Sequence, residues 1–187
     1  MEENETMALL PGDRFVFKEF EWVVLDNNVD GGILAIMASA WTEEHFQFDE
    51  NCDNDYKTSS LRRKLFERLL PVLGCYNLLL HKVDLTADNG DQNYGSVMDF
   101  VFILSCDEYR KYYKYTPKGH FQWTCTPLYI PYDDNIASVR FLNTDDIFVA
   151  DRPDFCNGVY PACVFNPNRV KITKRIEVRE REEEEWE

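Results

Sequence analysis

The chain of 187 residues is long enough for one domain with a sizeable core, since 44% of its residues are hydrophobic and 14% are aromatic. Its formal net charge of −14 argues against broad neutralisation of nucleic-acid phosphates and against an anionic membrane surface. We therefore expect no direct binding of nucleic acid and no membrane association. The charge leaves open a protein partner with a basic surface, the alternative being that it serves solubility alone.

The first residues are acidic, and residues 1–10 are expected to be a frayed N-terminus. No leader is visible, and no apolar run approaches the roughly 20 residues of a membrane-spanning helix, so we expect a cytoplasmic location. The six cysteines include no C-x-x-C pair. In a reducing compartment this pattern indicates buried free thiols, and we expect neither a metal site nor a cofactor.

The folded part is predicted to open with three strands, over residues 14–18, 21–26 and 33–37. The last two flank the sequence NNVDGG, which is rich in turn-forming residues, so they should form a hairpin. We expect one domain over residues 11–175. Residues 176–187 should be an acidic tail that is either solvated or folded back onto the basic sequence RVKITKR before it.

Residues 42–55 hold six acids and no Lys or Arg, which indicates a solvated loop or an irregular helix. The central glycine and the regularly spaced oxygens of a calcium loop are missing from this segment. Its carboxylates are instead candidate contacts for a basic partner: Glu43, Glu44, Asp49, Glu50, Asp53 and Asp55.

Leucines and a phenylalanine recur at helical spacing over residues 58–73, so this segment is predicted to be the first main helix. Thr58, Ser59 or Ser60 should cap its start, and Pro71 should bend or end it. The other face of this helix carries arginines and a lysine, and it is either a solvated face or a binding patch.

The second main helix is predicted directly after a buried strand. Residues 100–104, FVFIL, form a continuous β-favouring run that suits a strand covered on both faces. Ser105 and Glu108 have the spacing of a capping box, in which each side chain bonds an amide near the other. A helix should therefore begin after Ser105 and run toward Tyr115.

The other segments read as short strands with turns between them, such as the Asn-Gly pair at 89–90. Strands dominate, and the two helices lie far apart in the sequence. The sequence therefore predicts an α+β fold of small irregular antiparallel sheets with two main helices and long loops. The additional strands are expected over residues 78–84, 120–124, 137–142, 147–150 and 158–165.

Catalytic motifs give no positive signal. The three histidines lack the spacing of a metal site or a catalytic triad, and there is no G-x-S-x-G elbow, Walker loop or G-x-G-x-x-G. We therefore expect a protein that is not an enzyme and name no catalytic residue. A cysteine and a histidine that are distant in sequence can still meet in a fold, so a pair of that kind stays open.

Aromatic residues of the second half are the stronger binding signal, because a tyrosine joins an apolar ring to a polar hydroxyl. We expect the tryptophans in the core and some of the tyrosines on the surface. Candidate partner contacts in this half are three tyrosines and four aspartates: Tyr112, Tyr113, Tyr129, Asp133, Asp134, Asp145 and Asp146.

Five short patterns follow one another along the chain: WVVLD, SSLR, DFVFILSCDEY, QWTCTP and GVYPA. In this order they resemble an uncharacterised domain family of bacterial and phage proteins, over roughly residues 14–166. The resemblance implies a C-type-lectin-like fold, which also serves formylglycine-generating enzymes and hypervariable phage receptor-binding proteins. The patterns lie at residues 22–26, 59–62, 99–109, 122–127 and 158–162.

The chain departs from the family pattern at two positions, where Cys125 and Tyr160 stand in place of the usual arginines. If those arginines form a shared polar site, this chain has lost it. The copper-binding cysteine motifs of the formylglycine relatives find no match, so their oxidase chemistry does not carry over.

The leading hypothesis is a non-enzymatic acidic binding protein, associated with phage, that occupies a basic surface of a host protein. A nucleic-acid-handling protein fits, such as a CRISPR or other defence nuclease, which would make the chain an anti-defence inhibitor. The alternative is a small-ligand-binding or enzymatic domain with its site in the loops around Trp123 and Tyr160. A third hypothesis is a structural domain of a larger assembly.

Overall fold

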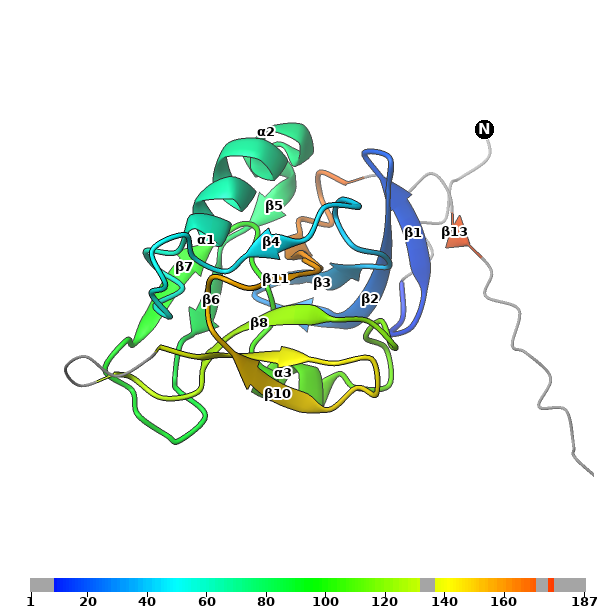
Figure 1. The fold of residues 1–187 in the computed structure, drawn as a ribbon. Coiled ribbons are helices and arrows are strands. Elements are labelled where there is room, and N and C mark those ends of the chain that lie inside the picture. The colour runs from blue at the N-terminus through cyan, green and yellow to red at the C-terminus, as the bar shows by residue number, and fades with distance from the viewer. Residues whose placement is uncertain (1–8, 132–136, 171–174, 177–187) are drawn as a thin grey trace, which may run out of the picture.

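The three strands predicted at the start of the chain lie side by side in the largest sheet (Figure 1). The computed structural model describes residues 9–131, 137–170 and 175–176. The large sheet has the order β13-β1-β2-β3-β12-β5, with every pairing antiparallel. Its strands are β1 (Arg14–Phe17), β2 (Phe20–Val29), β3 (Gly32–Met37), β5 (Leu78–Leu79), β12 (Ala162–Phe165) and β13 (Arg175–Ile176).

The predicted hairpin around NNVDGG is confirmed, but its strands run further into that sequence than expected. β2 continues to Val29, which pairs with Gly32, so only Asp30 and Gly31 are left in the turn. Both turn residues have positive φ, 51° at Asp30 and 78° at Gly31. An Asp-Gly pair in this conformation suits a two-residue hairpin loop, because its twist matches that of the flanking strands.

Phe165 is central to the core on this sheet. Its ring is fully buried and meets the rings of Phe15, Phe17 and Trp22 edge to face, with centroids 5.3, 5.4 and 4.9 Å away. Edge-to-face contact sets the positive rim of one ring against the negative face of another and adds to the burial of apolar area. Since Phe165 belongs to β12, it ties the end of the chain to the strands at its beginning.

Three smaller sheets contain the other described strands. One has the order β10-β9-β8, and the other two pair β6 with β7 and β4 with β11. The β6–β7 and β4–β11 pairs were not predicted, since β4, β7 and β11 carry no alternating pattern long enough to signal a strand. The strands are β4 (Phe46–Gln47), β6 (His81–Asp84), β7 (Ser96–Asp99), β8 (Gln122–Pro127), β9 (Val139–Leu142), β10 (Phe148–Asp151) and β11 (Cys156–Asn157).

Helices are few and short in the described residues, which confirms the α+β class. The first main helix is a continuous helical segment of three parts, and a 3₁₀ turn follows it. The second main helix is α3. The segments are α1 (Ser60–Lys64), the π-helical η1 (Leu65–Leu69), α2 (Leu70–Leu73), the 3₁₀ turn η2 (Cys75–Asn77) and α3 (Cys106–Lys111).

Ser59 caps the first helix as one of the three expected candidates, with its Oγ accepting from the amide of Arg62. Of the two expected effects of Pro71, to bend or to end the helix, the second does not occur, because the helix continues to Leu73, its predicted end. A proline lacks the amide of an α-helical bond, and its ring clashes with the carbonyl four residues earlier. The wider π turn of η1 directly before α2 places Pro71 in the first turn of the next helical segment, where a proline is tolerated.

Residues 100–104 are buried as expected from Val101 onward, but the predicted strand is wrong. The segment is extended and is joined to β12 by a single bridge between Phe102 and Ala162. On that side of β12, Val164 and Phe165 are already paired with β5. Residues 100–104 therefore cannot extend this single bridge into a ladder. The capping box that follows is confirmed, and α3 ends at Lys111, earlier than expected.

The chain ends extend the described fold beyond the expected limits of 11 and 175. Leu9, assigned to the frayed end, is buried in the core, and its carbonyl accepts from Asn27 Nδ2 at 3.2 Å. Ile176, assigned to the tail, pairs with Arg14 of β1. The remainder of the expected tail and most of RVKITKR lie outside the described residues. Within the part that is described, no helix has the length and apolar character to cross a bilayer.

Replacing Phe165 with alanine should lower the free energy of unfolding by about 3–5 kcal/mol, because it removes a fully buried ring and leaves a cavity among three others. Urea unfolding measures this change. Phe155→Ala is the matched control, since that ring is 53% exposed, and it should change stability by less than about 0.5 kcal/mol. Similar effects of the two variants would contradict the described core.

Candidate functional site

Two clefts meet along α3, and Arg110 lines both of them. The first, which we call the N-terminal cleft, has a volume of about 440 Å³ and lies between β6, the loop after it and the start of α3. The second, which we call the aromatic cleft, has a volume of about 360 Å³ and lies between α3 and the β9–β10 hairpin. Its walls are Tyr109, Arg110, Tyr113, Lys118, Leu142, Asp146 and Phe148.

The start of α3 is fixed by its capping box. The Oγ of Ser105 accepts from the amide of Glu108 at 3.2 Å, and a Glu108 carboxylate oxygen accepts from the amide of Ser105 at 2.8 Å. Asp107 and Glu108 lie in the first turn and Arg110 and Lys111 in the last, the order that favours the helix dipole. Local sequence therefore determines where the side chains of α3 point.

Glu108 also holds His81 of β6 through its second oxygen. The Nε2 of His81 lies 3.2 Å from Glu108 Oε1, and its Nδ1 lies 2.7 Å from Asp30 at the tip of the β2–β3 hairpin. The ring stacks on Phe102 with centroids 4.6 Å apart. Burial by itself lowers the pKa of His81, but the hydrogen bonds to Glu108 and Asp30 outweigh it, so the pKa lies above its ordinary value.

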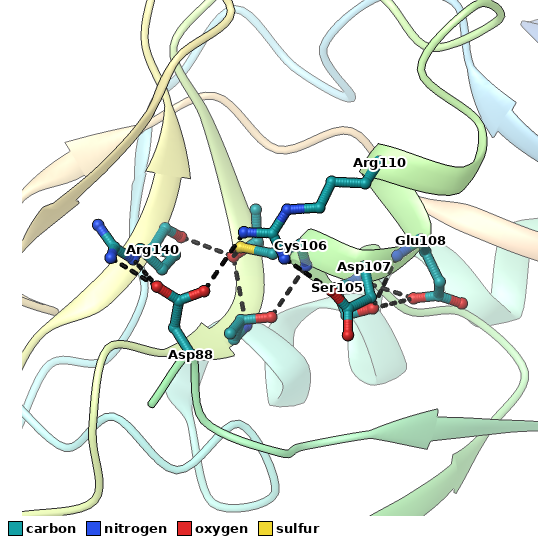
Figure 2. A network of polar contacts seen from close by, with 9 residues as sticks. Asp88, Ser105, Cys106, Asp107, Glu108, Arg110 and Arg140 are labelled. Atoms are coloured by element: carbon teal, nitrogen blue, oxygen red, sulfur yellow. Dashed lines mark hydrogen bonds and ion pairs between the residues drawn. The ribbon is translucent and has the colours of Figure 1, made fainter. Parts of the chain in front are cut away.

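The floor of the N-terminal cleft is a network of ion pairs (Figure 2). Asp88 accepts from Arg140 Nε at 2.9 Å and lies 3.4 Å from Arg110 Nη2. Arg110 also donates to Asp107 at 2.6 Å. One carboxylate thus joins a strand arginine to a helix arginine, and both arginines are engaged within the protein.

Cys106 is the first residue of α3 and lines the same cleft, with its side chain buried. Its amide donates to Thr126 Oγ1 at 2.9 Å, and its sulfur lies 3.7 Å from Thr124 Oγ1. Burial raises the pKa of the thiol, and the threonine hydroxyls offset this only in part. A nucleophilic cysteine needs a stabilised thiolate, and both ring nitrogens of His81 are already held by carboxylates. This arrangement favours a structural role for both residues.

The aromatic cleft is built from rings and two cations. Tyr109 donates to Gln122 Oε1 of β8 at 2.6 Å and meets the ring of Phe148, over which the Arg110 guanidinium lies at 5.0 Å. Lys118 Nζ lies 3.2 Å from the centre of the Tyr113 ring, within cation–π range. Burial lowers the pKa of this lysine, and Asp146 opposes the shift.

The predicted contacts in the first acidic segment have different environments. Glu43 and Glu44 are exposed, so their carboxylates face solvent. Asp53 is exposed too, but its carboxylate accepts from the amide of Asp55 at 3.0 Å and from Thr58 Oγ1 at 3.2 Å. Glu50 is exposed too but pairs with Lys64 at 2.6 Å, and burial raises the pKa of the half-buried Asp55.

Asp49 corrects the expectation of a solvated loop. Only 2% of it is exposed, and it accepts bonds from the amides of Asn51, Asp53 and Ser60. A buried carboxylate that holds three amides fixes the loop onto the start of α1 and offers no contact to a partner.

The predicted contacts of the second half are also divided. Tyr112 is buried and bonds Asp26, which corrects its assignment as a surface anchor. Tyr113 is 56% exposed and meets Asp146 in the aromatic cleft. Asp145 is exposed and Tyr129 is half-buried. The last two of the set, Asp133 and Asp134, lie outside the described residues.

The residues of the alternative hypothesis lie in the core. Trp123 is fully buried and donates to the carbonyl of Phe46 at 2.8 Å, and Tyr160 is 4% exposed and stacks on His120. Cys125, at the other departure from the family pattern, is fully buried, and burial raises the pKa of its thiol. Neither described cleft is lined by these three side chains, although Thr126 of the same strand lines the N-terminal cleft.

Sequence reasoning missed Arg110, which lines both clefts, and four residues that line one of them or pair with its lining, namely Asp88, Lys118, Arg140 and Phe148. Nothing in the sequence linked Arg110, in the last turn of α3, to Phe148 of β10, over which its guanidinium lies. Arg62 and Asp99, which belong to two of the five patterns, form a bidentate pair at 2.8 and 2.7 Å. That pair joins α1 to β7 and is structural.

Comparisons with known proteins give no assignment, since no family model, no curated protein and no solved structure matches the chain. Among the described residues, no three His, Cys, Asp or Glu side chains are placed to hold a metal ion.

Stability should fall as the pH rises through the titration of His81. The folded pKa lies above the unfolded value near 6.5, so the stabilising contribution is complete below about pH 6.5 and is lost above the folded pKa. In urea unfolding, the stability difference between wild type and His81→Gln should shrink from about pH 6 to about pH 9. His45→Gln, at an exposed position, is the control, and an unchanged difference for His81→Gln would contradict the arrangement.

Iodoacetamide should modify the exposed Cys75 and Cys156 in the folded protein and leave Cys106 unmodified, because a buried thiol with a raised pKa forms little thiolate. Peptide mass spectrometry after brief labelling at neutral pH measures this, and labelling in urea provides the control for complete reaction. Rapid modification of Cys106 in the folded state would instead indicate a reactive thiol.

Proposed function

We propose that this chain is a non-enzymatic binding protein whose acidic and aromatic surface occupies a basic surface of a partner protein. The observation that carries the proposal is the aromatic cleft, where two predicted contacts from distant parts of the sequence, Tyr113 and Asp146, lie together. Exposed tyrosine, a stacked arginine and an apolar wall are the composition of protein-binding hot spots. Asp88, Glu108 and Arg110 of the N-terminal cleft are engaged internally, which is the arrangement of a framework.

The charge of the chain suggests what kind of partner binds. Glu43, Glu44 and Asp145 present carboxylates to solvent, and the net charge is −14. A surface that normally holds nucleic acid is already arranged for negative charge, so an acidic protein can compete for it. We infer a nucleic-acid-handling host protein, such as a CRISPR or other defence nuclease, and a phage-associated inhibitor that acts in the host cytoplasm.

The finer fold assignment is part of this proposal. A C-type-lectin-like fold accounts for small irregular sheets joined by long loops, with the two helical segments outside them. The five sequence patterns support it, and two of them meet in the pair of Arg62 and Asp99. Fold alone does not determine function, so the proposal rests on the surface.

A small-ligand role has one observation in its favour, the N-terminal cleft of about 440 Å³, which lies in the size range of ligand pockets. A ligand there would have to displace ion pairs such as that of Asp88 with Arg140. We therefore rank it second, and place it at this cleft and away from Trp123 and Tyr160.

The proposal is tested by capture of a partner from nuclease-treated host lysate on the tagged protein, with mass spectrometry to identify it. The complex should form at low salt and weaken as salt rises, because exposed charges are screened. Reversing Glu43 and Glu44 together, or Asp145, to lysine should weaken binding of the identified partner by about tenfold.

The matched control reverses Glu19 and Glu67, which are exposed and outside the predicted contact set, and should change binding little. Equal losses for contact and control variants would mean that only net charge matters. Binding that is indifferent to salt and to all the reversals would contradict the proposed mechanism.

A further inference from the structure

β10 is the outer strand of the β10-β9-β8 sheet and is drawn at the lower edge of the molecule in Figure 1. It pairs with β9 on one side. On its other side, no strand from residues 9–131 or 137–170 pairs with it. Edge strands of this kind present backbone donors and acceptors to whatever extended chain approaches them.

The register shows which groups face outward. The amide of Asn143 donates to the carbonyl of Ile147 at 3.1 Å, so these two residues form a hydrogen-bonded pair at the end of the ladder. Along an antiparallel ladder, hydrogen-bonded residue pairs alternate with non-hydrogen-bonded pairs. Val149 and Asp151 therefore bond β9, whereas Phe148 and Ala150 point their N–H and C=O groups away from it.

A hydrogen bond on the far side of β9 agrees with this alternation. Arg140 is paired with Ala150, and its carbonyl accepts from Thr124 Oγ1 of β8 at 2.7 Å. Arg140 therefore turns its backbone toward β8 and leaves Ala150 without a bond to β9, as expected for a non-bonded pair.

The side chains of β10 suit an added strand. Phe148 faces α3 and forms part of the aromatic cleft, and Ala150 is exposed and small. Natural edge strands are commonly protected from pairing by an inward lysine, a proline or a bulge. The sequence of β10, FVAD, has none of these, and its pairing with β9 is regular.

We propose that β10 binds an extended, lysine- or arginine-containing segment of the partner as an additional strand, with an apolar side chain of that segment at the aromatic cleft. The proposal rests on the proposed function, that the chain binds a basic protein, and specifies the mode. Main-chain bonds to Phe148 and Ala150 supply affinity, and the cleft and the charges supply selectivity.

The charges around β10 favour a basic partner segment over a second copy of the chain as the added strand. Asp145 and Asp146 lie before β10 and Asp151 ends it. Arg152 follows Asp151, but its guanidinium is already paired with Asp154 at 2.7 Å. In antiparallel self-pairing with Phe148 opposite Phe148, Asp151 of each copy would lie opposite Asp145 of the other. Like charges across strands are destabilising, whereas cations on a partner segment would be attracted at both ends.

The test uses a defined probe, a short peptide that alternates lysine with valine and has one central phenylalanine. Amide exchange followed by NMR should show rapid exchange at Phe148 and Ala150 in the free protein, with Val149 and Asp151 protected by β9. Adding the probe should protect Phe148 and Ala150. The same peptide with N-methyl groups on the amides of its bonding edge should bind about tenfold more weakly, since each backbone bond contributes a factor of about two to ten.

Ala150→Pro removes the outward amide from the protein side and should also weaken probe binding by about tenfold. An edge position whose N–H faces solvent tolerates proline, and the unfolding midpoint checks this. Ala150→Val keeps the amide and is the matched control, which should bind like wild type. The proposal is overturned if the methylated and unmethylated peptides bind equally, or if the probe protects amides elsewhere than at β10. Neither result depends on a protein variant.

The proposed function and the proposed β10 binding mode can be disproved independently of each other. If the partner captured from lysate binds Ala150→Pro and wild type equally, β10 is not its binding edge and the proposed function stands. If the probe protects Phe148 and Ala150 but the charge-reversal variants bind the captured partner normally, the edge strand stands and the electrostatic mechanism is wrong.

Discussion

The shared carboxylate of Glu108 is the contact on which the arrangement of the clefts depends. One of its oxygens accepts from the amide and the hydroxyl of Ser105, and the other meets His81, whose ring in turn holds Asp30. A single side chain therefore fixes the start of α3, the strand β6 and the tip of the β2–β3 hairpin. With α3 fixed, Arg110 lies between the two clefts and Tyr113 faces β10.

Sequence predicted best where the interaction is local. The capping box of α3, the Ser59 cap and the hairpin before Gly32 all depend on residues within a few positions of one another. The prediction from sequence failed where a residue distant in the sequence determines the local structure. Asp49 reads as one acid among six, yet the amides at the start of α1 bury it, and residues 100–104 read as a strand although β5 already occupies the edge they would need.

The candidate site shows the same division. Tyr113 and Asp146 were identified by residue type, because tyrosine is typical of binding surfaces and an acid suits a basic partner. Their meeting in one cleft depends on the packing of α3 against the β9–β10 hairpin, which no periodicity encodes. Tyr112, the neighbour of Tyr113, has the same chemistry and was misassigned, since in the turn that follows α3 its ring packs into the core while that of Tyr113 is exposed.

The internal pairing of cations explains how an acidic chain can keep a selective surface. Arg62, Arg110 and Arg140 are each engaged by an aspartate within the fold, so the carboxylates left facing solvent, such as those of Glu43 and Asp145, dominate the field outside. Exposed charges of this kind raise the rate of encounter and set orientation more than they add affinity. In the proposed complex, affinity would then come from the outward backbone groups of β10 beside the aromatic wall, because short-range bonds are the ones that salt screens least.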